Sequence, residues 1–380
     1  MEKTWNLKYH EKSIKYIHNN FKSHLFNESL SFNLTDSYMN NLDCSKKLHI
    51  NSKNILLWNF VGLELTIEQF YLPIFIAMKT TVNNVYIIYS KTLKIYKVTE
   101  LGQIIPILCK NLDIKSIDTF INPREDINSN NFLKYNNISK IFGKYIPKNI
   151  INLNYGNNVC VIKTKMYIQP NLNNCVLYRG ICPYKSNYLW KNAKPWNQKQ
   201  KMLIYPGTFN NNNDKNQLSF VQLLDKDILM GYKILFVGNM KKNCANYSYL
   251  KSLESLLIKK NIDYEIGCLD DDMNVFLNTL LQCRGLIFYG VHLYDRVRVL
   301  TEGLFANLPF IVNDSIKTIP DLYFECGYKV KNNNKKDLND KIKKLIDKDW
   351  GNEPIELTKK YFQIDKLSEE IVNQINIRTN

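Results

Sequence analysis

The sequence lacks any long hydrophobic run. No stretch reaches about 18 consecutive apolar residues, the length that a membrane-spanning helix requires. The opening residues, MEKTWNLKYHEKS, hold no apolar core of the kind found in secretory signal peptides. We therefore expect neither a membrane span nor a secretory signal, and we expect a cytoplasmic protein.

Recognisable cysteine motifs are also missing. The nine cysteines are odd in number and irregularly spaced, and no C-x-x-C occurs. This pattern favours reduced thiols and argues against a structural zinc site. No G-x-S-x-G nucleophile elbow is present, so nothing supports Ser-His-Asp or Cys-His catalysis.

What the sequence does contain is enough apolar material for two folded domains. The chain has 380 residues, of which 45% are hydrophobic and 23% are charged, and the charges are dispersed rather than blocked. This composition excludes disorder over most of the length and predicts two domains.

Positive charge is in excess, with a net charge of +16 and a pI near 9.2. One interpretation is a polyanionic partner, such as nucleic acid, a membrane surface or phosphate-bearing substrates. The other is an AT-rich genome, which overuses Lys, Ile and Asn without functional demand; a viral source would place the protein in the host cytoplasm. No basic stripe interleaved with aromatic residues indicates a nucleic-acid groove.

The second half of the chain shows a regular alternation of short apolar runs and helical patterns. Such alternation predicts a doubly wound α/β domain. The predicted strands are 202–205, 233–237, 264–267, 286–289 and 309–312, and the predicted helices are 218–224, 250–257, 276–283, 300–307 and 338–345.

The first half is harder to interpret. Strand, loop, helix and strand over 54–58, 59–65, 66–79 and 85–89 predict a parallel sheet, but 91–157 cannot be assigned. The polar stretch 183–201, with two prolines, is predicted to be a linker, and 354–376 a terminal helix. The expected domains are an extension over 1–50, a first Rossmann-like domain over 51–190, a second over 200–355, and a helix over 356–380 that returns toward the first.

Candidate ligand-binding residues follow the strands of the second domain. In an open parallel sheet, ligands bind outside the carboxyl ends of the strands. Glycines there let backbone N–H groups approach a phosphate, although each glycine alone is also compatible with a plain turn. The residues at these positions are Gly207, Thr208, Gly238, Asn239, Gly290 and His292.

The run from Tyr294 to Pro309 carries the strongest chemical signal. It predicts a loop that enters a helix, with Arg296 and Arg298 at the start of the helix and Glu302 one turn later. Guanidinium groups at a helix N-terminus suit a diphosphate, and a carboxylate can accept hydrogen bonds from ribose hydroxyls. The alternative is a surface Arg–Glu pair with little energetic value.

Residues 202–314 resemble the C-terminal, nucleotide-sugar-binding domain of GT-B glycosyltransferases, with a family 4-like pattern. The pieces that carry the resemblance are LIYPGTF, ILFVGN, LIFYG and RVLTEGLFANLPFIVND, in this order. The resemblance implies two Rossmann-like domains that face a cleft, with an acceptor domain first and a donor domain second. It also implies chemistry that needs no bound metal.

The resemblance assigns roles to individual residues of this sequence. Glu302 would hold the donor ribose. The other donor-site residues would be Gly207, Thr208 and Lys215 at the phosphate, Arg296 and Arg298 at the diphosphate, and Gly238 and Asn239 at the base. Gly62, in the loop 60–62, would face the cleft, and His292 would contact the sugar.

Some features depart from the family pattern. Many retaining members carry a second Glu eight residues before the position of Glu302, where this chain has Tyr294, so the stereochemistry stays open. If the enzyme inverts, Glu64 or Glu68 could act as the base, although both also fit a solvated helix start. Asp270, Asp271 and Asp272 fit a helix N-cap better than a metal site.

The sequence thus predicts a glycosyltransferase that moves a sugar from a UDP- or GDP-sugar to a hydroxyl of a glycan or protein. Two alternatives stay open. The Arg pattern before Glu302 is also similar to phage glucosyltransferases that modify hydroxymethylcytosine in DNA. The missing first Glu would suit a non-catalytic binding or scaffold protein.

Overall fold

The computed structural model describes residues 46–59, 72–89, 93–122, 130–154, 175–177, 183–209, 215–238, 245–268, 273–290, 298–316, 319, 321–362, 369, 372–373, 375–377 and 379. These residues form two compact units. Lys185–Lys360 makes up the C-terminal unit. The described residues of Glu28–Tyr184, together with those of Tyr361–Asn380, make up the N-terminal unit.

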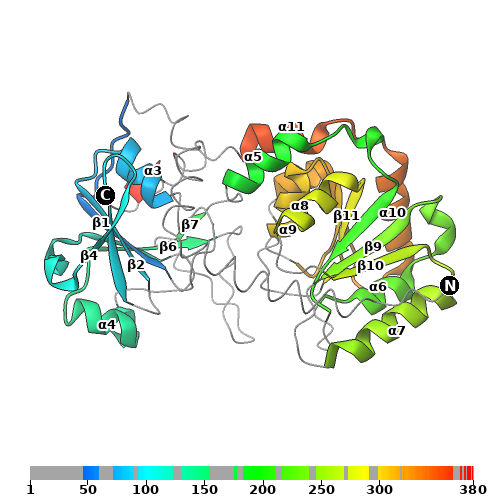
Figure 1. Ribbon diagram of the computed structural model, residues 1–380, viewed down its shortest axis with the longest axis horizontal. Coiled ribbons are helices and arrows are strands. Elements are labelled where there is room, and N and C mark those ends of the chain that lie inside the picture. Colours follow the sequence, from blue (N-terminus) through cyan, green and yellow to red (C-terminus); the bar gives the residue numbers. More distant parts are fainter. Residues whose placement is uncertain are drawn as a thin grey trace. The chain divides into compact units, whose positions relative to one another are not determined.

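The N-terminal unit is built on a seven-stranded sheet (Figure 1). Its strands are β1 (Asn54–Asn59), β2 (Asn84–Tyr89), β3 (Lys94–Val98), β4 (Ile104–Ile107), β5 (Thr119–Asn122), β6 (Asn149–Asn154) and β7 (Cys175–Leu177), in the order β4-β3-β2-β1-β5-β6-β7. All neighbours are parallel except β3 and β4, which extend the sheet as an antiparallel hairpin. The helices are α3 (Leu72–Lys79) and α4 (Asn136–Phe142), with short 3-10 turns η2 (Cys109–Asn111), η3 (Ile114–Ser116) and η4 (Phe132–Lys134).

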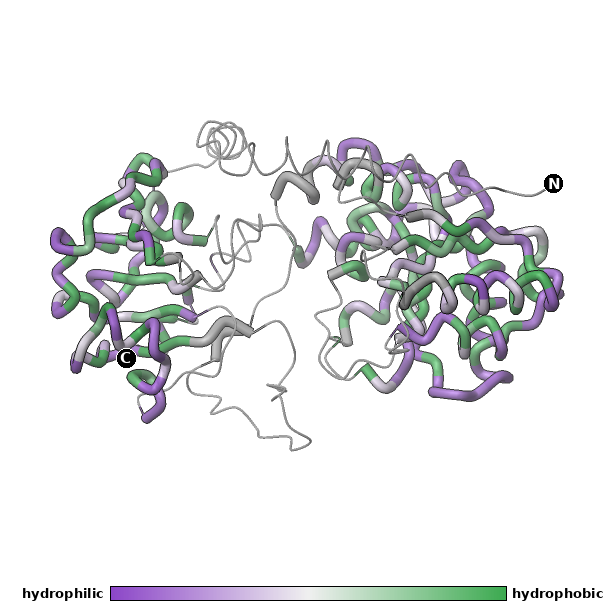
Figure 2. The backbone as a smooth tube through the Cα atoms, turned by 60° about the horizontal axis from the view of Figure 1, so that its bottom comes forward, coloured by the Kyte–Doolittle hydropathy of each residue, from purple (hydrophilic) through white to green (hydrophobic). Residues whose placement is uncertain are grey.

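Aromatic side chains fill the core on the α4 face of this sheet. Phe120 of β5 meets Phe132 and Phe142 edge-on, at ring-centroid distances of 4.9 and 5.7 Å. Leu56 and Trp58 of β1 join the same cluster, because alternate residues of a strand face the same side. Figure 2 shows hydrophobic stretches of the tube toward the inside of each unit and hydrophilic stretches toward its outside.

The C-terminal unit has a six-stranded, fully parallel sheet. Its strands are β8 (Met202–Pro206), β9 (Lys233–Gly238), β10 (Tyr264–Cys268), β11 (Gly285–Phe288), β12 (Phe310–Asn313) and β13 (Gly327–Val330), in the order β10-β9-β8-β11-β12-β13. The helices are α5 (Pro183–Asn192), α6 (Gln217–Leu223), α7 (Ala245–Lys259), α8 (Met273–Gln282), α9 (Arg298–Phe305), α10 (Lys335–Asp347) and α11 (Glu353–Tyr361), with 3-10 turns η6 (Trp196–Gln198), η7 (Lys226–Leu229) and η8 (Asp321–Cys326).

Helices cover both faces of this sheet. Residues of α6, α7 and α10 share one core with inward residues of β8, β9 and β11. Figure 1 shows α8 and α9 on the opposite face. Both units are therefore Rossmann-like, which confirms the predicted fold class of two Rossmann-like α/β domains.

The stretch 183–201, predicted to be a linker, is instead a packed part of the C-terminal unit. It forms α5 and η6, and its tryptophans anchor it. Trp190 donates from Nε1 to Thr358 Oγ1 at 2.8 Å, and Trp196 donates from Nε1 to the Arg284 carbonyl at 2.6 Å. The prediction was wrong because it rested on the polar composition of the stretch. The two tryptophans that fix it bond to residues far along the chain, which the local sequence does not indicate.

The end of the chain also differs from the prediction of one helix over 354–376. Helix α11 ends at Tyr361, and Phe362 is not helical. Beyond it, Asn376 accepts a hydrogen bond from the Asn51 backbone N–H at 2.9 Å and donates to the His49 carbonyl at 2.8 Å. These bonds hold the chain end beside the residues that precede β1 in the N-terminal unit.

Lysine side chains bond to the C-terminal ends of two helices of the C-terminal unit, Lys199 from a buried position and Lys260 from a half-buried one. Lys199 donates from Nζ to the carbonyls of Ala306 and Asn307, just beyond α9, and Lys260 donates to three carbonyls at the end of α6. Cations are favourable at helix C-termini, where backbone carbonyls lack partners. Burial lowers the pKa of Lys199 to about 7, while the Cys283 thiol has a smaller opposing effect.

We expect Lys199 to make the free energy of unfolding rise with pH. Its pKa is about 7 when folded against 10.5 for an ordinary lysine, so the unfolded chain binds more protons between these values. From pH 7 to pH 9 this contribution amounts to about 2 kcal/mol. Urea denaturation of Lys199→Met should lack this rise, whereas Lys201→Met, at an exposed position, should keep it. An unchanged pH dependence in Lys199→Met would contradict the assignment.

Among the described residues, no helix combines the length and the apolar character needed to cross a bilayer.

Candidate functional site

The candidate site lies at the carboxyl ends of the strands of the C-terminal unit. The strand order reverses between β8 and β11, since β9 and β10 lie on one side of β8 and β11 to β13 on the other. Such a reversal leaves a crevice outside the strand ends, because the two connections depart in opposite directions. Gly207 and Thr208 follow β8, and Tyr289 and Gly290 follow β11 at this reversal.

Two of the predicted glycines touch each other beside this reversal. Gly207 donates its backbone N–H to the Val237 carbonyl at 2.8 Å. A Cβ atom on Gly238 would lie 1.9 Å from the Gly207 carbonyl oxygen, closer than atoms can approach. Only glycine therefore fits at position 238, and its absence of a side chain lets the ends of β8 and β9 meet backbone to backbone.

Lys215 reaches back to the same point from the start of α6. Its Nζ lies 5.4 Å from the centroid of the Phe288 ring, at the end of β11. The Tyr205 hydroxyl donates to the Lys215 carbonyl and so fixes the backbone of this residue. Burial raises the pKa of Tyr205 well above its usual value, so the hydroxyl keeps its proton as a donor. A cation is thus held across the β8–β11 reversal.

Gln217 supports the loop after β8, and sequence reasoning missed it. Its side chain is 1% exposed; Nε2 donates to the Thr208 carbonyl at 3.5 Å and Oε1 accepts from the Tyr249 hydroxyl at 2.8 Å. The sequence did hold a signal for its burial. Gln217 lies three and four residues before Phe220 and Val221, so it shares their buried face of α6.

Helix α9 begins at Arg298, the predicted diphosphate ligand, and carries Glu302 on its second turn. Because α9 follows β11 in a parallel α/β unit, its N-terminus lies at the carboxyl edge of the sheet. Glu302 is buried, with 5% of its surface exposed. A Cβ atom on Gly303 would lie 2.9 Å from Leu286 Cδ1, so α9 packs closely on β11 at this level.

A polar network ties together the ends of β11, β12 and β13. Asn313 donates from Nδ2 to Asn332 Oδ1 at 2.9 Å, and the Asn333 backbone N–H donates to the Tyr289 hydroxyl at 2.8 Å. Asn313 Oδ1 also accepts from the Ser315 backbone N–H at 2.9 Å. Asn313 and Tyr289 are buried. This network was not predicted, because hydrogen bonds between distant loops leave no local pattern in a sequence.

The structure brings Gly207, Thr208, Lys215 and Gly238 to one edge and places the start of α9 on that same edge. Other predicted positions fall outside the described residues, namely Gly62, Glu64, Glu68, Asn239, Asp270, Asp271, Asp272, His292, Tyr294 and Arg296. In the part of the chain that is described, no three His, Cys, Asp or Glu side chains are grouped as metal ligands.

No family model matches the sequence, and no curated protein matches it. Solved structures do match. HepE from Anabaena, in a crystal structure with UDP, is 10% identical with a TM-score of 0.51 and covers 84% of this chain and 98% of its own. A glycosyltransferase from Rickettsia africae is 12% identical with a TM-score of 0.49 and covers 87% of this chain and 96% of its own.

The likeness to HepE shows the fold. The chain has the GT-B fold of two Rossmann-like α/β units, which confirms the fold class that the sequence predicted. At 10% identity the likeness carries no residue-level assignment.

Proposed function

We propose that this protein is a nucleotide-sugar glycosyltransferase whose C-terminal unit binds the donor. The observation that carries the proposal is the edge at which β8 and β9 meet through Gly207 and Gly238, with Lys215 held over the end of β11. A fixed cation at the reversal point of an α/β sheet suits a diphosphate.

The chemistry follows from the charge that develops on the leaving group. Cleavage of the sugar bond leaves a nucleotide diphosphate, and negative charge builds on its oxygens. Lys215, Arg298 and the N-terminus of α9 stabilise that charge, with Arg296 as a further cation. In this proposal no metal ion takes part.

The remaining contacts recognise the rest of the donor. Glu302 accepts hydrogen bonds from the ribose hydroxyls, which demands a fixed, desolvated carboxylate, and its burial meets that demand. Asn239 lies beside the base, and His292 contacts the sugar. UDP is the nucleotide that we favour, since HepE, which shares the fold, was crystallised with it.

The N-terminal unit takes the acceptor, a hydroxyl of a glycan or protein. Gly62 contributes to substrate binding, and Glu64 acts as the base if the reaction inverts. The transferred group is a hexose. A decayed donor site in a scaffold protein and glucosylation of DNA are the competing proposals.

A thermal-shift panel of UDP, GDP and their sugars tests the function. A nucleotide at 100 times its dissociation constant should raise the free energy of unfolding by about 2.7 kcal/mol, and we expect UDP or UDP-hexose to do so. ATP and inorganic phosphate serve as controls for non-specific binding to a basic protein. The absence of any shift with every nucleotide would contradict donor binding and favour the scaffold.

A further inference from the structure

An exposed hydrophobic strip runs along the free edge of the N-terminal sheet. Seven large hydrophobic side chains are exposed among the described residues, and three of them fall within eight positions. They are Leu101 (77% exposed), Ile105 (45%) and Leu108 (61%), which we call the apolar edge. Leu101 lies in the turn between β3 and β4, Ile105 on β4, and Leu108 directly after it. Clustered exposed apolar side chains of this kind mark an interaction surface.

The backbone of β4 is poorly suited to pairing with another strand. Thr99 donates its N–H to the Gln103 carbonyl at 2.8 Å, which fixes the alternation of the hydrogen-bonded pairs along the hairpin. In that alternation Ile104 and Pro106 turn their backbone groups away from β3. Pro106 has no N–H, so the free edge lacks one of the donors that strand addition would use. A partner at this edge would therefore contact the side chains of β4 rather than pair with its backbone.

Lysines accompany the apolar edge. In the β3–β4 register, Lys97 lies directly across from Ile105. Lys94, at the start of β3, and Lys110 and Lys115, in the two 3-10 turns that follow β4, are all exposed. The described residues between 46 and 154 contain twelve lysines and only three acidic residues. The surface is therefore apolar and cationic together.

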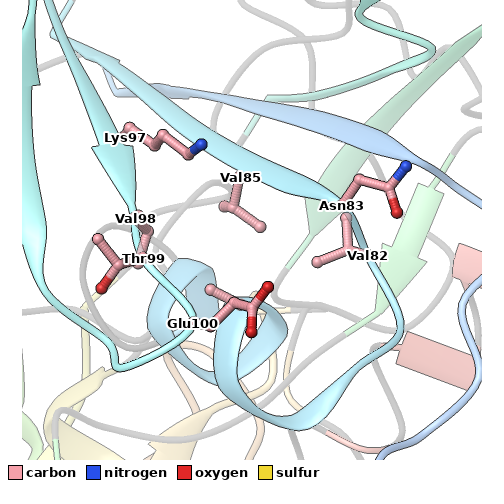
Figure 3. Close-up of a pocket in the computed structure, with 8 residues that line it drawn as sticks. Val82, Asn83, Val85, Lys97, Val98, Thr99 and Glu100 are labelled. Carbon is pink, nitrogen blue, oxygen red and sulfur yellow. The ribbon is translucent and has the colours of Figure 1, made fainter.

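The acidic residue nearest the apolar edge is turned toward α3. Gly102, with φ of 77°, packs this turn against Met78 of α3. Beneath the turn is a cavity of about 160 Å³, and Glu100 lines it together with Val82, Val85 and Lys97. Figure 3 shows the Glu100 carboxylate extending into this cavity on the side of Val82. Glu100 is itself exposed, and its carboxylate lies at the cavity between this turn and α3.

We propose that the apolar edge docks the protein on an anionic lipid surface. Leucine and isoleucine side chains insert at the boundary between headgroups and acyl chains, while neighbouring lysines attract anionic headgroups. A nucleic acid would also attract the lysines. Single strands, however, bind by stacking their bases on aromatic side chains, and exposed aliphatic side chains make no favourable contact with a phosphate backbone. This inference is independent of the donor site.

Vesicle flotation tests the proposal with two charge-matched variants. Leu101→Glu/Leu108→Glu changes the apolar edge, and Met230→Glu/Ile258→Glu places the same two charges on exposed hydrophobic positions (56% and 64%) of the C-terminal unit. We expect wild type to bind vesicles containing phosphatidylserine at least about tenfold more tightly than pure phosphatidylcholine vesicles. The Leu101/Leu108 variant should lose at least about tenfold in affinity, and the Met230/Ile258 variant less than about twofold.

Three outcomes would overturn the proposal. Wild type could fail to bind phosphatidylserine vesicles. Both variants could lose affinity equally, which would indicate charge alone. Duplex DNA could bind more tightly than vesicles, with a steep salt dependence and no loss in the Leu101/Leu108 variant. Thermal melts confirm that the variants are folded, and light scattering would show whether the apolar edge pairs two copies instead.

Discussion

Gly238→Ala should destabilise the protein by about 3 kcal/mol, near the upper end of the cost of overpacking a core. The new Cβ would lie 1.9 Å from the carbonyl oxygen and 2.8 Å from the carbonyl carbon of Gly207. Both atoms belong to the backbone, so no side-chain rotation relieves the clash. The ends of β8 and β9 would have to separate, and the hydrogen bond from Gly207 to Val237 would weaken. Urea denaturation with an unchanged m-value measures this loss.

Gly267→Ala is the matched control for this substitution. Gly267 occupies the corresponding end of the neighbouring strand β10, and its nearest atom to a new Cβ is Val237 Cγ1 at 3.4 Å, an ordinary contact. Its replacement should change the free energy of unfolding by less than about 1 kcal/mol, since alanine also restricts the unfolded chain. Equal losses in both variants, or a small loss in Gly238→Ala, would show that the β8–β9 contact does not depend on glycine.

The C-terminal unit could be predicted from sequence because its signals are local. Each of its central strands is a short apolar run, and each main helix carries leucines or isoleucines at helical spacing, as in Leu253 and Leu257 of α7. Once the strands were located, the residues at their carboxyl ends could be identified as well. That is why Gly207 and Gly238 were found before their contact was known.

The N-terminal unit was harder because its elements are short and mixed. The described residues between 91 and 157 form two antiparallel strands, three 3-10 turns, a seven-residue helix and two parallel strands. Few of these elements are long enough to show a period of their own. The strand β5, for example, has four residues, and all four are buried, so it neither alternates nor stands out from a buried loop.

The parts of the candidate site that escaped prediction depend on distant partners. The partners of Gln217 are Thr208 and Tyr249, the latter 32 residues away, and those of Asn313 include Tyr289 and Asn332. Lys199 likewise seemed part of a polar linker until its bonds to the end of α9, over 100 residues later, were seen. Hydrogen-bonded pairs of this kind leave no spacing that a single sequence reveals.

Glu302→Gln should weaken UDP binding by about 5- to 13-fold. The substitution keeps the shape of a buried side chain and removes its charge. Hydrogen bonds to charged groups contribute about 1.5–3 kcal/mol against about 0.5–1.5 kcal/mol for neutral ones, and the difference converts to this factor. UMP should lose the same factor, because it carries the same ribose. Glu325→Gln, at an exposed position on η8, should leave the affinity unchanged.

Calorimetric titration of UDP into wild type, Glu302→Gln and Glu325→Gln is the most direct test of a nucleotide site at the start of α9. We predict saturable binding to wild type, the stated loss in Glu302→Gln, and none in Glu325→Gln. Wild type that takes up no UDP, or a folded Glu302→Gln protein that binds UDP as tightly as wild type, would contradict the site.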